Sequence, residues 1–186
     1  MPFCKSLPEN AGPPVIYTSY PDIYGPWSEM SEVLMNGPSP FSEAEREVIF
    51  SLAAGASGSN YVFVAHSEVA YARGYPRGLL ERLLEDVDAE GVDGKFRPVV
   101  AYTIKLGRAP NELTQADADA VFAAGWDEKA LHDIIAITAR AAFMHRLTAG
   151  FGFIPMSRER AAEKAKARIE KGYVNLYPSL AARQGS

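Results

Sequence analysis

Only one of the 186 residues is a cysteine, Cys4. A single thiol cannot form an intramolecular disulfide, so nothing in the chain indicates folding in an oxidising compartment. The sequence also lacks an apolar stretch as long as a signal peptide or a membrane span requires. We therefore expect a cytoplasmic protein that does not enter a membrane.

The chain also lacks a strong excess of positive charge. Its 19 Lys and Arg residues face 23 Asp and Glu residues, which gives a net charge of -4. Binding to nucleic acid needs a basic surface for the phosphates, so this balance argues against nucleic acid as a partner. No Gly-rich phosphate loop, nucleotide fingerprint or Ser-His-Asp elbow is present, and we expect no cofactor.

Histidine is scarce as well, with three residues in the chain. His132 and His145 are thirteen residues apart on one predicted helix and therefore face different sides of it. A cluster of His66, Glu47 and His145 across helices is conceivable, but its spacing is unlike that of metal ligands. We predict no metal site.

What the sequence does contain is a set of strong helix signals. Hydrophobic residues make up 47% of the chain, and its length suits one domain with a core. Ser42 and Glu45 form a capping box, and apolar residues then recur at helical spacing. Caps, glycines and periodicity predict helices over residues 26–35, 43–55, 60–73, 79–87, 115–125, 127–150 and 157–172.

Residues 96–107 are ambiguous, because Val99, Val100, Tyr102 and Ile104 could form a strand. No second strand-like segment exists to pair with them, and an isolated strand leaves its backbone groups unsatisfied. We therefore predict a helix that starts at or just before Pro98, and an all-α fold. The charged helix 157–172 has a thin apolar stripe, so we expect it on the surface or against another subunit.

The ends of the chain are predicted to be less regular. Residues 1–25 are expected to form an extended N-terminal arm, with Pro13, Pro14 and Pro21 fixing local turns. Its aromatic residues should pack on the domain itself or on a neighbouring subunit. Residues 26–172 would form one helical domain, and residues 173–186 a C-terminal tail.

Three residues of the predicted helix near position 60 share one face: Ser59, Val62 and His66, at positions i, i+3 and i+7. Glu47 lies on the preceding helix, and a short turn joins the two helices. If these helices pack as an antiparallel pair, Glu47 can approach His66. A carboxylate orients an imidazole and raises its basicity, so the pair could transfer protons. A buried structural histidine explains the same spacing.

The segment from Ser42 to Ala72 resembles the core of the alkylhydroperoxidase D-like (AhpD-like), or carboxymuconolactone decarboxylase, family. The family pattern is a Glu, a Cys-x-x-Cys twelve residues later, and a His four residues after the second Cys. Glu47, Ser59, Val62 and His66 occupy those four positions. Residues 102–125 are similar to the peroxidase-related branch, and residues 143–152 to the family's downstream helix, so the resemblance covers most of residues 40–152. It implies an AhpD-like helical bundle with a helical-hairpin core, and a homo-oligomer, either a trimer or a hexamer.

The resemblance also implies a function that this chain departs from. In family members with the dithiol, the cysteines reduce a peroxide while Glu and His relay protons, and a thiolate is the nucleophile. Ser59 and Val62 cannot do this, and Cys4 lies in the predicted arm without a partner. We therefore expect the antioxidant-family fold without thiol peroxidase activity; a peroxidase that uses an unrecognised thiol ranks lowest.

Two functions then remain open. In the first, Glu47 and His66 act as acid and base on a small, possibly acidic, substrate, as in the decarboxylase branch. Ser59 and Tyr61 would donate hydrogen bonds, and Arg146 or Arg73 would supply the cation. In the second, the protein is a non-catalytic oligomer that binds a small ligand or serves as a scaffold.

Overall fold

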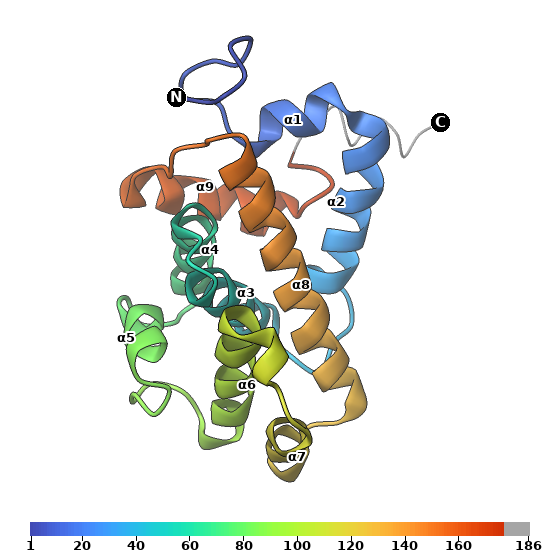
Figure 1. The fold of residues 1–186 in the computed structure, drawn as a ribbon, viewed down its shortest axis with the longest axis vertical. Coiled ribbons are helices and arrows are strands. Elements are labelled where there is room, and N and C mark those ends of the chain that lie inside the picture. The colour runs from blue at the N-terminus through green and yellow to red at the C-terminus, as the bar shows by residue number, and fades with distance from the viewer. Residues whose placement is uncertain (177–186) are drawn as a thin grey trace.

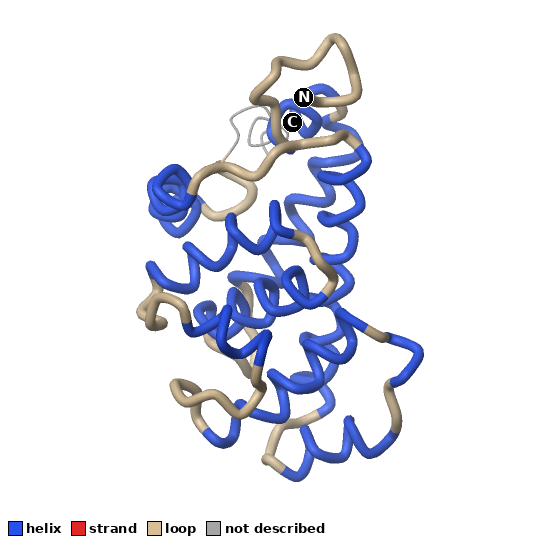
Figure 2. The backbone as a smooth tube through the Cα atoms, turned by 60° about the vertical axis from the view of Figure 1, so that its left-hand side comes forward, coloured by secondary structure: helices blue, strands red, loops and turns tan. Residues whose placement is uncertain are grey.

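The computed structural model describes residues 1–176, which form a bundle of α-helices with no strand in that range (Figures 1 and 2). The helices are α1 (Pro13–Ser19), α2 (Pro21–Asn36), α3 (Glu43–Ala56), α4 (Asn60–Ala72), α5 (Leu79–Glu85), α6 (Arg97–Arg108), α7 (Gln115–Ala123), α8 (Glu128–Gly150) and α9 (Arg158–Lys171). Two 3-10 turns, Gly94–Phe96 and Pro110–Glu112, lie next to α6. The all-α prediction is confirmed.

The helical hairpin at the centre of the bundle is α3 and α4, in the middle of Figure 1. Ser42 caps α3, with its Oγ accepting from the Glu45 N–H while the Glu45 carboxylate accepts from the Ser42 N–H. This is the capping box that the sequence predicts. Gly58 makes the turn into α4 with φ +83°, a left-handed conformation that glycine adopts without a steric cost. Helix α3 also contacts α5, α6 and α8, and Val48, Phe50 and Leu52 are fully buried.

Residues 97–108 are helical, as predicted, and α6 packs closely on α3. An added Cβ at Gly107 would lie 2.9 Å from the Ala53 carbonyl oxygen, so only glycine permits this approach. Helix α7 follows, with a capping box of Thr114 and Asp117 at its start, and α8 is the longest helix of residues 1–176.

The prediction of an extended arm over residues 1–25 is wrong for its second half, because α1 spans Pro13–Ser19 and α2 begins at Pro21. Both prolines stand in the first turn of a helix, where the missing N–H has no helical acceptor and the fixed φ fits. Pro26 lies inside α2 instead of starting it. Tyr17 and Tyr24 are buried, and their ring centroids lie 4.8 Å apart. These aromatic residues therefore pack on their own domain, which was one of the two predicted alternatives.

Helix α9 packs across α4, away from α6 and α7 (Figure 1). Arg158 anchors its start, with its guanidinium donating to Ser67 Oγ at 2.8 Å and Glu81 Oε1 at 2.6 Å. Ala161 and Ala165 are buried, so the thin apolar stripe of this charged helix faces its own domain. Among residues 1–176, no helix is both long and apolar enough to cross a membrane. Most of the predicted tail, residues 177–186, lies outside the described residues.

Candidate functional site

Glu47 and His66 meet in the interior of the helical hairpin. His66 Nδ1 lies 2.8 Å from Glu47 Oε2, and the two residues are 5% and 3% exposed. Glu47 comes from the middle of α3 and His66 from the middle of α4. The sequence spacing predicts this approach, and the hydrogen bond gives it a defined geometry.

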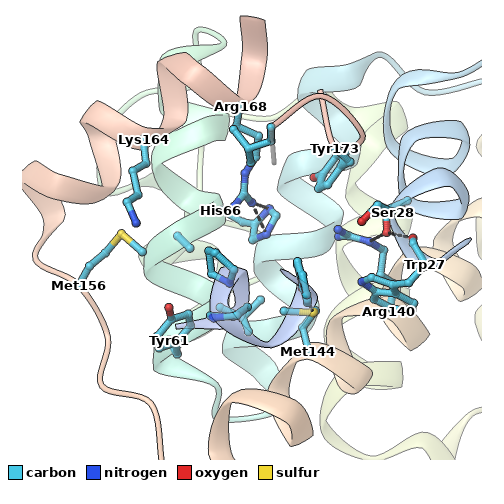
Figure 3. Close-up of a pocket in the computed structure, with 17 residues that line it drawn as sticks. Trp27, Ser28, Tyr61, His66, Arg140, Met144, Met156, Lys164, Arg168 and Tyr173 are labelled. Carbon is cyan, nitrogen blue, oxygen red and sulfur yellow. Dashed lines mark hydrogen bonds between the residues drawn. The ribbon is translucent and has the colours of Figure 1, made fainter. Parts of the chain in front are cut away.

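Arg168 of α9 closes the other side of the imidazole. Its Nη1 lies 2.7 Å from His66 Nε2, as one of the dashed lines in Figure 3 marks. A guanidinium only donates, so Nε2 must accept and Nδ1–H must donate to Glu47. Burial lowers the pKa of His66 to about 3, helped by the Arg168 charge and opposed by the Glu47 carboxylate. The imidazole is therefore neutral at pH 7, with its tautomer set on both sides.

The second oxygen of Glu47 is also occupied. The Tyr173 hydroxyl, just after α9, donates to Glu47 Oε1 over 3.1 Å. Burial by itself would raise the pKa of Glu47, but His66, Arg168 and Arg140 together lower it. Burial and the neighbouring Glu47 carboxylate raise the pKa of Tyr173. The cluster thus holds an ionised carboxylate, a neutral imidazole and a protonated phenol.

A cavity of about 70 Å³ lies beside His66, as the close-up in Figure 3 shows. It is formed where α1, α2, α4, α8 and α9 meet. Its lining includes three cationic side chains and a set of aromatic and apolar ones, among them Tyr17, Trp27, Ser28, Ser31, Tyr61, Val62, His66, Arg140, Met144, Met156, Lys164, Arg168 and Tyr173. The cavity therefore gives His66 a space in which a small molecule could lie.

Of the other predicted site residues, two line the cavity and one does not. Tyr61 and Val62 line the cavity beside His66. Ser59 does not: it precedes α4, is 2% exposed, and its Oγ has no hydrogen-bond partner. The predicted donor role of Ser59 therefore finds no support in this geometry, whereas Tyr61 stands at the cavity wall.

The cations that the sequence offered are not the ones at the cavity. Arg73 forms an ion pair with Glu43 at 2.5 Å. Arg146 lies along a separate groove between α3, α6 and α8, and donates to the Ala142 carbonyl. Neither side chain lines the cavity beside His66, because Arg73 follows the end of α4, two helical turns beyond His66, and Arg146 lies along the other groove.

His145 is also separate from the Glu47–His66 pair. Its Nδ1 lies 3.3 Å from Ser57 Oγ, beside the groove that Arg146 lines. Within residues 1–176, no group of three His, Cys, Asp or Glu side chains is placed to hold a metal ion. Cys4 is exposed in the segment before α1.

Sequence reasoning missed four residues at the site: Arg140, Lys164, Arg168 and Tyr173. Arg140 carries a signal that could have found it, because it lies on the buried face of α8 between Ile137 and Met144. A charged residue in an apolar stripe is unusual and indicates a special role. Nothing in the local pattern of Arg168 or Tyr173 marks either as part of a site more than 100 positions earlier in the chain.

Two solved structures are similar to this chain. An uncharacterized peroxidase-related protein from Silicibacter sp. TM1040 superimposes with a TM-score of 0.70 at 22% identity, over 77% of this chain and 75% of that one. The alkylhydroperoxidase AhpD core of an uncharacterized peroxidase-related protein from Ralstonia eutropha JMP134 gives 0.67 at 21% identity, over 79% and 76%. No family model and no curated protein matches the sequence. The chain thus has the AhpD-like helical fold, as predicted.

Proposed function

We propose that this protein is a member of the AhpD-like, carboxymuconolactone decarboxylase family in its peroxidase-related branch, without the redox dithiol. In this proposal Glu47 and His66 perform acid/base chemistry on a small acidic substrate. The observation that carries the proposal is the buried 2.8 Å contact between Glu47 and His66, with His66 at the wall of a cavity. Ser59 and Val62 offer no thiol at the start of α4, so electron transfer to a peroxide has no carrier there.

The role of each group follows from its protonation state. Glu47 holds the Nδ1–H of His66, which leaves the lone pair of Nε2 as the proton acceptor. When Nε2 takes a proton from a substrate C–H, the electron pair stays on the substrate next to its carbonyl group. The ionised Glu47 then stabilises the imidazolium until the proton is returned.

Arg168 gives a reason for an acidic substrate. Its guanidinium occupies Nε2 at 2.7 Å, so His66 cannot act as a base until Arg168 moves. A substrate carboxylate would draw Arg168 away, because a charged acceptor binds a guanidinium more strongly than a neutral imidazole does. Removal of that donor and of its charge would also raise the pKa of His66 from about 3.

The contact between Arg168 and His66 also favours a second function. If Arg168 stays on His66 throughout, the cluster of Glu47, His66, Arg168 and Tyr173 is a structural network. The cavity would then bind a small ligand without turnover, in a scaffold oligomer of the same fold. Breaking a buried charged network is costly, so such a network would persist without catalysis.

Proton exchange separates the two functions. Small 2-oxo and 3-oxo acids such as pyruvate and acetoacetate carry both a carboxylate and a C–H next to a carbonyl. In D₂O the protein should accelerate deuterium incorporation at that carbon, and Glu47→Gln or His66→Gln should slow it by about 100-fold or more, the contribution typical of a general base. His132→Gln, a change at an exposed residue of α8, is the control. Exchange that is absent, or equal in the His66→Gln variant, rejects the acid/base role.

Assembly and location stay predictions. We propose a homo-oligomer, a trimer or a hexamer, with a small molecule as ligand and without nucleic acid as partner. We also expect the protein in the cytoplasm.

A further inference from the structure

Arg140 is a buried cation with an unsatisfied nitrogen. It is 5% exposed on α8, and its Nε donates to Ser31 Oγ at 2.9 Å. Its Nη1 is buried and has no hydrogen-bond partner, and no carboxylate of residues 1–176 forms an ion pair with this guanidinium. The Glu47 carboxylate interacts with Arg140 through its charge but forms no hydrogen bond with it. Burying a charged group with an unsatisfied donor is costly, so this arrangement needs a physical reason.

Arg140 lines the cavity, and its Nη1 has no hydrogen-bond partner in the protein. The rings of Phe50 and Tyr173 each lie with their centroid 4.5 Å from Arg140 Cζ, so aromatic groups occupy the space over the guanidinium. Ser31 holds Nε, which fixes the orientation of the group. A planar guanidinium that is held in place is suited to bind a carboxylate through two parallel N–H donors.

The charge around the cavity has one sign. Arg140, Arg168 and Lys164 line it, and none of the lining residues within positions 1–176 is acidic. The Glu47 carboxylate does not line the cavity, and its oxygens are bound by His66 and Tyr173. The cavity therefore has a positive potential that favours an anion over a neutral molecule or a cation.

The walls and the volume limit the rest of the ligand. Tyr17, Trp27 and Met144 form an apolar side of the cavity next to Arg140. A volume of about 70 Å³ is roughly half of the 150 Å³ known to hold benzene in a protein interior. A ligand with a charged head and a short apolar body fits, whereas an aromatic acid does not fit without displacement of side chains.

We propose that Arg140 is the anion receptor of this cavity and that it binds the carboxylate of a short-chain acid of about two to four carbons. The short apolar body lies against Trp27 and Met144, and the acid extends toward His66. Arg140 contacts the ligand directly, while Ser31 positions Arg140. This inference names the substrate class of the site proposed above and rests on that proposal only for the assumption that the same cavity is used.

Binding of unreactive acids tests the inference without any turnover. Calorimetric titration of the purified full chain with propionate should give saturable binding, and propionamide, its neutral isostere, should bind at least tenfold more weakly. Butyrate should bind and benzoate should not, because of the cavity volume.

Arg140→Met should weaken propionate binding by about tenfold or more, the loss expected for hydrogen bonds to a charged group. Arg146→Met is the matched control, because Arg146 lies on the same helix outside the cavity, and it should bind propionate as the wild type does.

A second variant covers the case in which Arg140→Met does not fold, as circular dichroism would show. Ser31→Ala removes the acceptor that orients Arg140 and should weaken propionate binding several-fold. Equal binding of propionate and propionamide by the wild type, or unchanged propionate binding by a folded Arg140→Met or Ser31→Ala variant, overturns the inference. Propionate binding without deuterium exchange would reject the acid/base proposal and leave this inference standing. Deuterium exchange without selective propionate binding would support the acid/base proposal and reject the inference about Arg140.

Discussion

His66 has both ring nitrogens engaged, one by a carboxylate and one by a guanidinium. These two partners act in opposite directions on its protonation. Glu47 favours the imidazolium, while Arg168 and burial disfavour it, and the second effect is larger because the pKa falls to about 3. The basicity of His66 therefore depends on the position of Arg168.

The low pKa of His66 makes stability depend on pH. The folded protein keeps His66 neutral down to about pH 3, whereas the unfolded chain protonates it near pH 6.5. Between these values the unfolded state binds more protons, so the free energy of unfolding falls as the pH is lowered. From pH 7 to pH 5 we expect His66 to contribute a loss of about 1–2 kcal/mol in urea unfolding. His66→Gln should remove that part of the slope and His132→Gln should retain it; an equal slope in all three proteins would contradict the assignment.

Neither Ser59 nor Val62 carries the thiol that hydroperoxide reduction needs. We expect no dithiol-dependent hydroperoxide turnover above background in the wild-type protein, since neither side chain cycles between redox states. The double change Ser59→Cys with Val62→Cys should introduce that turnover, measured as hydroperoxide loss in the presence of dithiothreitol. Ser59→Ala with Val62→Ala is the control for the altered packing. Wild-type turnover that survives Cys4→Ala would show that a thiol is not needed and would refute this interpretation.

At the scale of elements, α9 completes a site that α3 and α4 begin. It brings Arg168 and Lys164 to the cavity, and its end places Tyr173 on Glu47. Arg158 ties the start of α9 to the hairpin through Ser67 and the buried Glu68. The position of Arg168 is therefore set by contacts more than two helical turns away.

Loosening α9 should change the state of His66. Arg158→Met removes the anchor, and we expect the free energy of unfolding to fall by about 1 kcal/mol, a modest value because Arg158 is partly exposed. Amide hydrogen exchange over α9 should accelerate. The pKa of His66 should rise as Arg168 moves away, which NMR titration measures. Lys166→Met, at an exposed position of the same helix, should change none of the three. Faster exchange with an unchanged His66 pKa would show that α9 does not control the imidazole.

On the scale of the whole molecule, the helix pair α2 and α8 exposes several large apolar side chains. Ile23, Met30 and Val33 of α2 are 62%, 42% and 69% exposed, and Phe143 of α8 is 41% exposed. Trp27 and Phe143 pack with ring centroids 4.1 Å apart, which joins the two helices in this surface. Apolar surface of this kind is typical of a protein–protein interface.

The predicted homo-oligomer should depend on that surface. Sedimentation equilibrium should give a multiple of the 20.2 kDa chain mass, and Ile23→Glu with Val33→Glu should shift it toward the monomer, because charges in an apolar interface are costly. Ile154→Glu, at an exposed apolar residue before α9, is the control. A wild-type protein that sediments as a monomer would reject both the oligomer and this assignment of its interface.

The helical fold and the Glu47–His66 pairing could be predicted from the sequence because both depend on local signals. A capping box, glycines at the ends of helices and a 3.6-residue period define α3 and α4, and a short turn leaves the hairpin few ways to pack. The extended arm is a wrong prediction for residues 13–25, because Pro13 and Pro21 do not fix turns in an extended segment but stand in the first turn of a helix, where proline fits.

Only the tertiary structure decided which cations surround His66. Arg168 and Tyr173 are 102 and 126 positions from the residues they bind, His66 and Glu47. Their contacts depend on the angle at which α9 crosses α4, and no local pattern encodes that angle. Arg140 reaches the cavity only because α8 packs beside α2 and α3. The amino-acid sequence determined that Glu47 and His66 pair, because both stand on a hairpin defined by local signals, and long-range packing determined the charges around that pair.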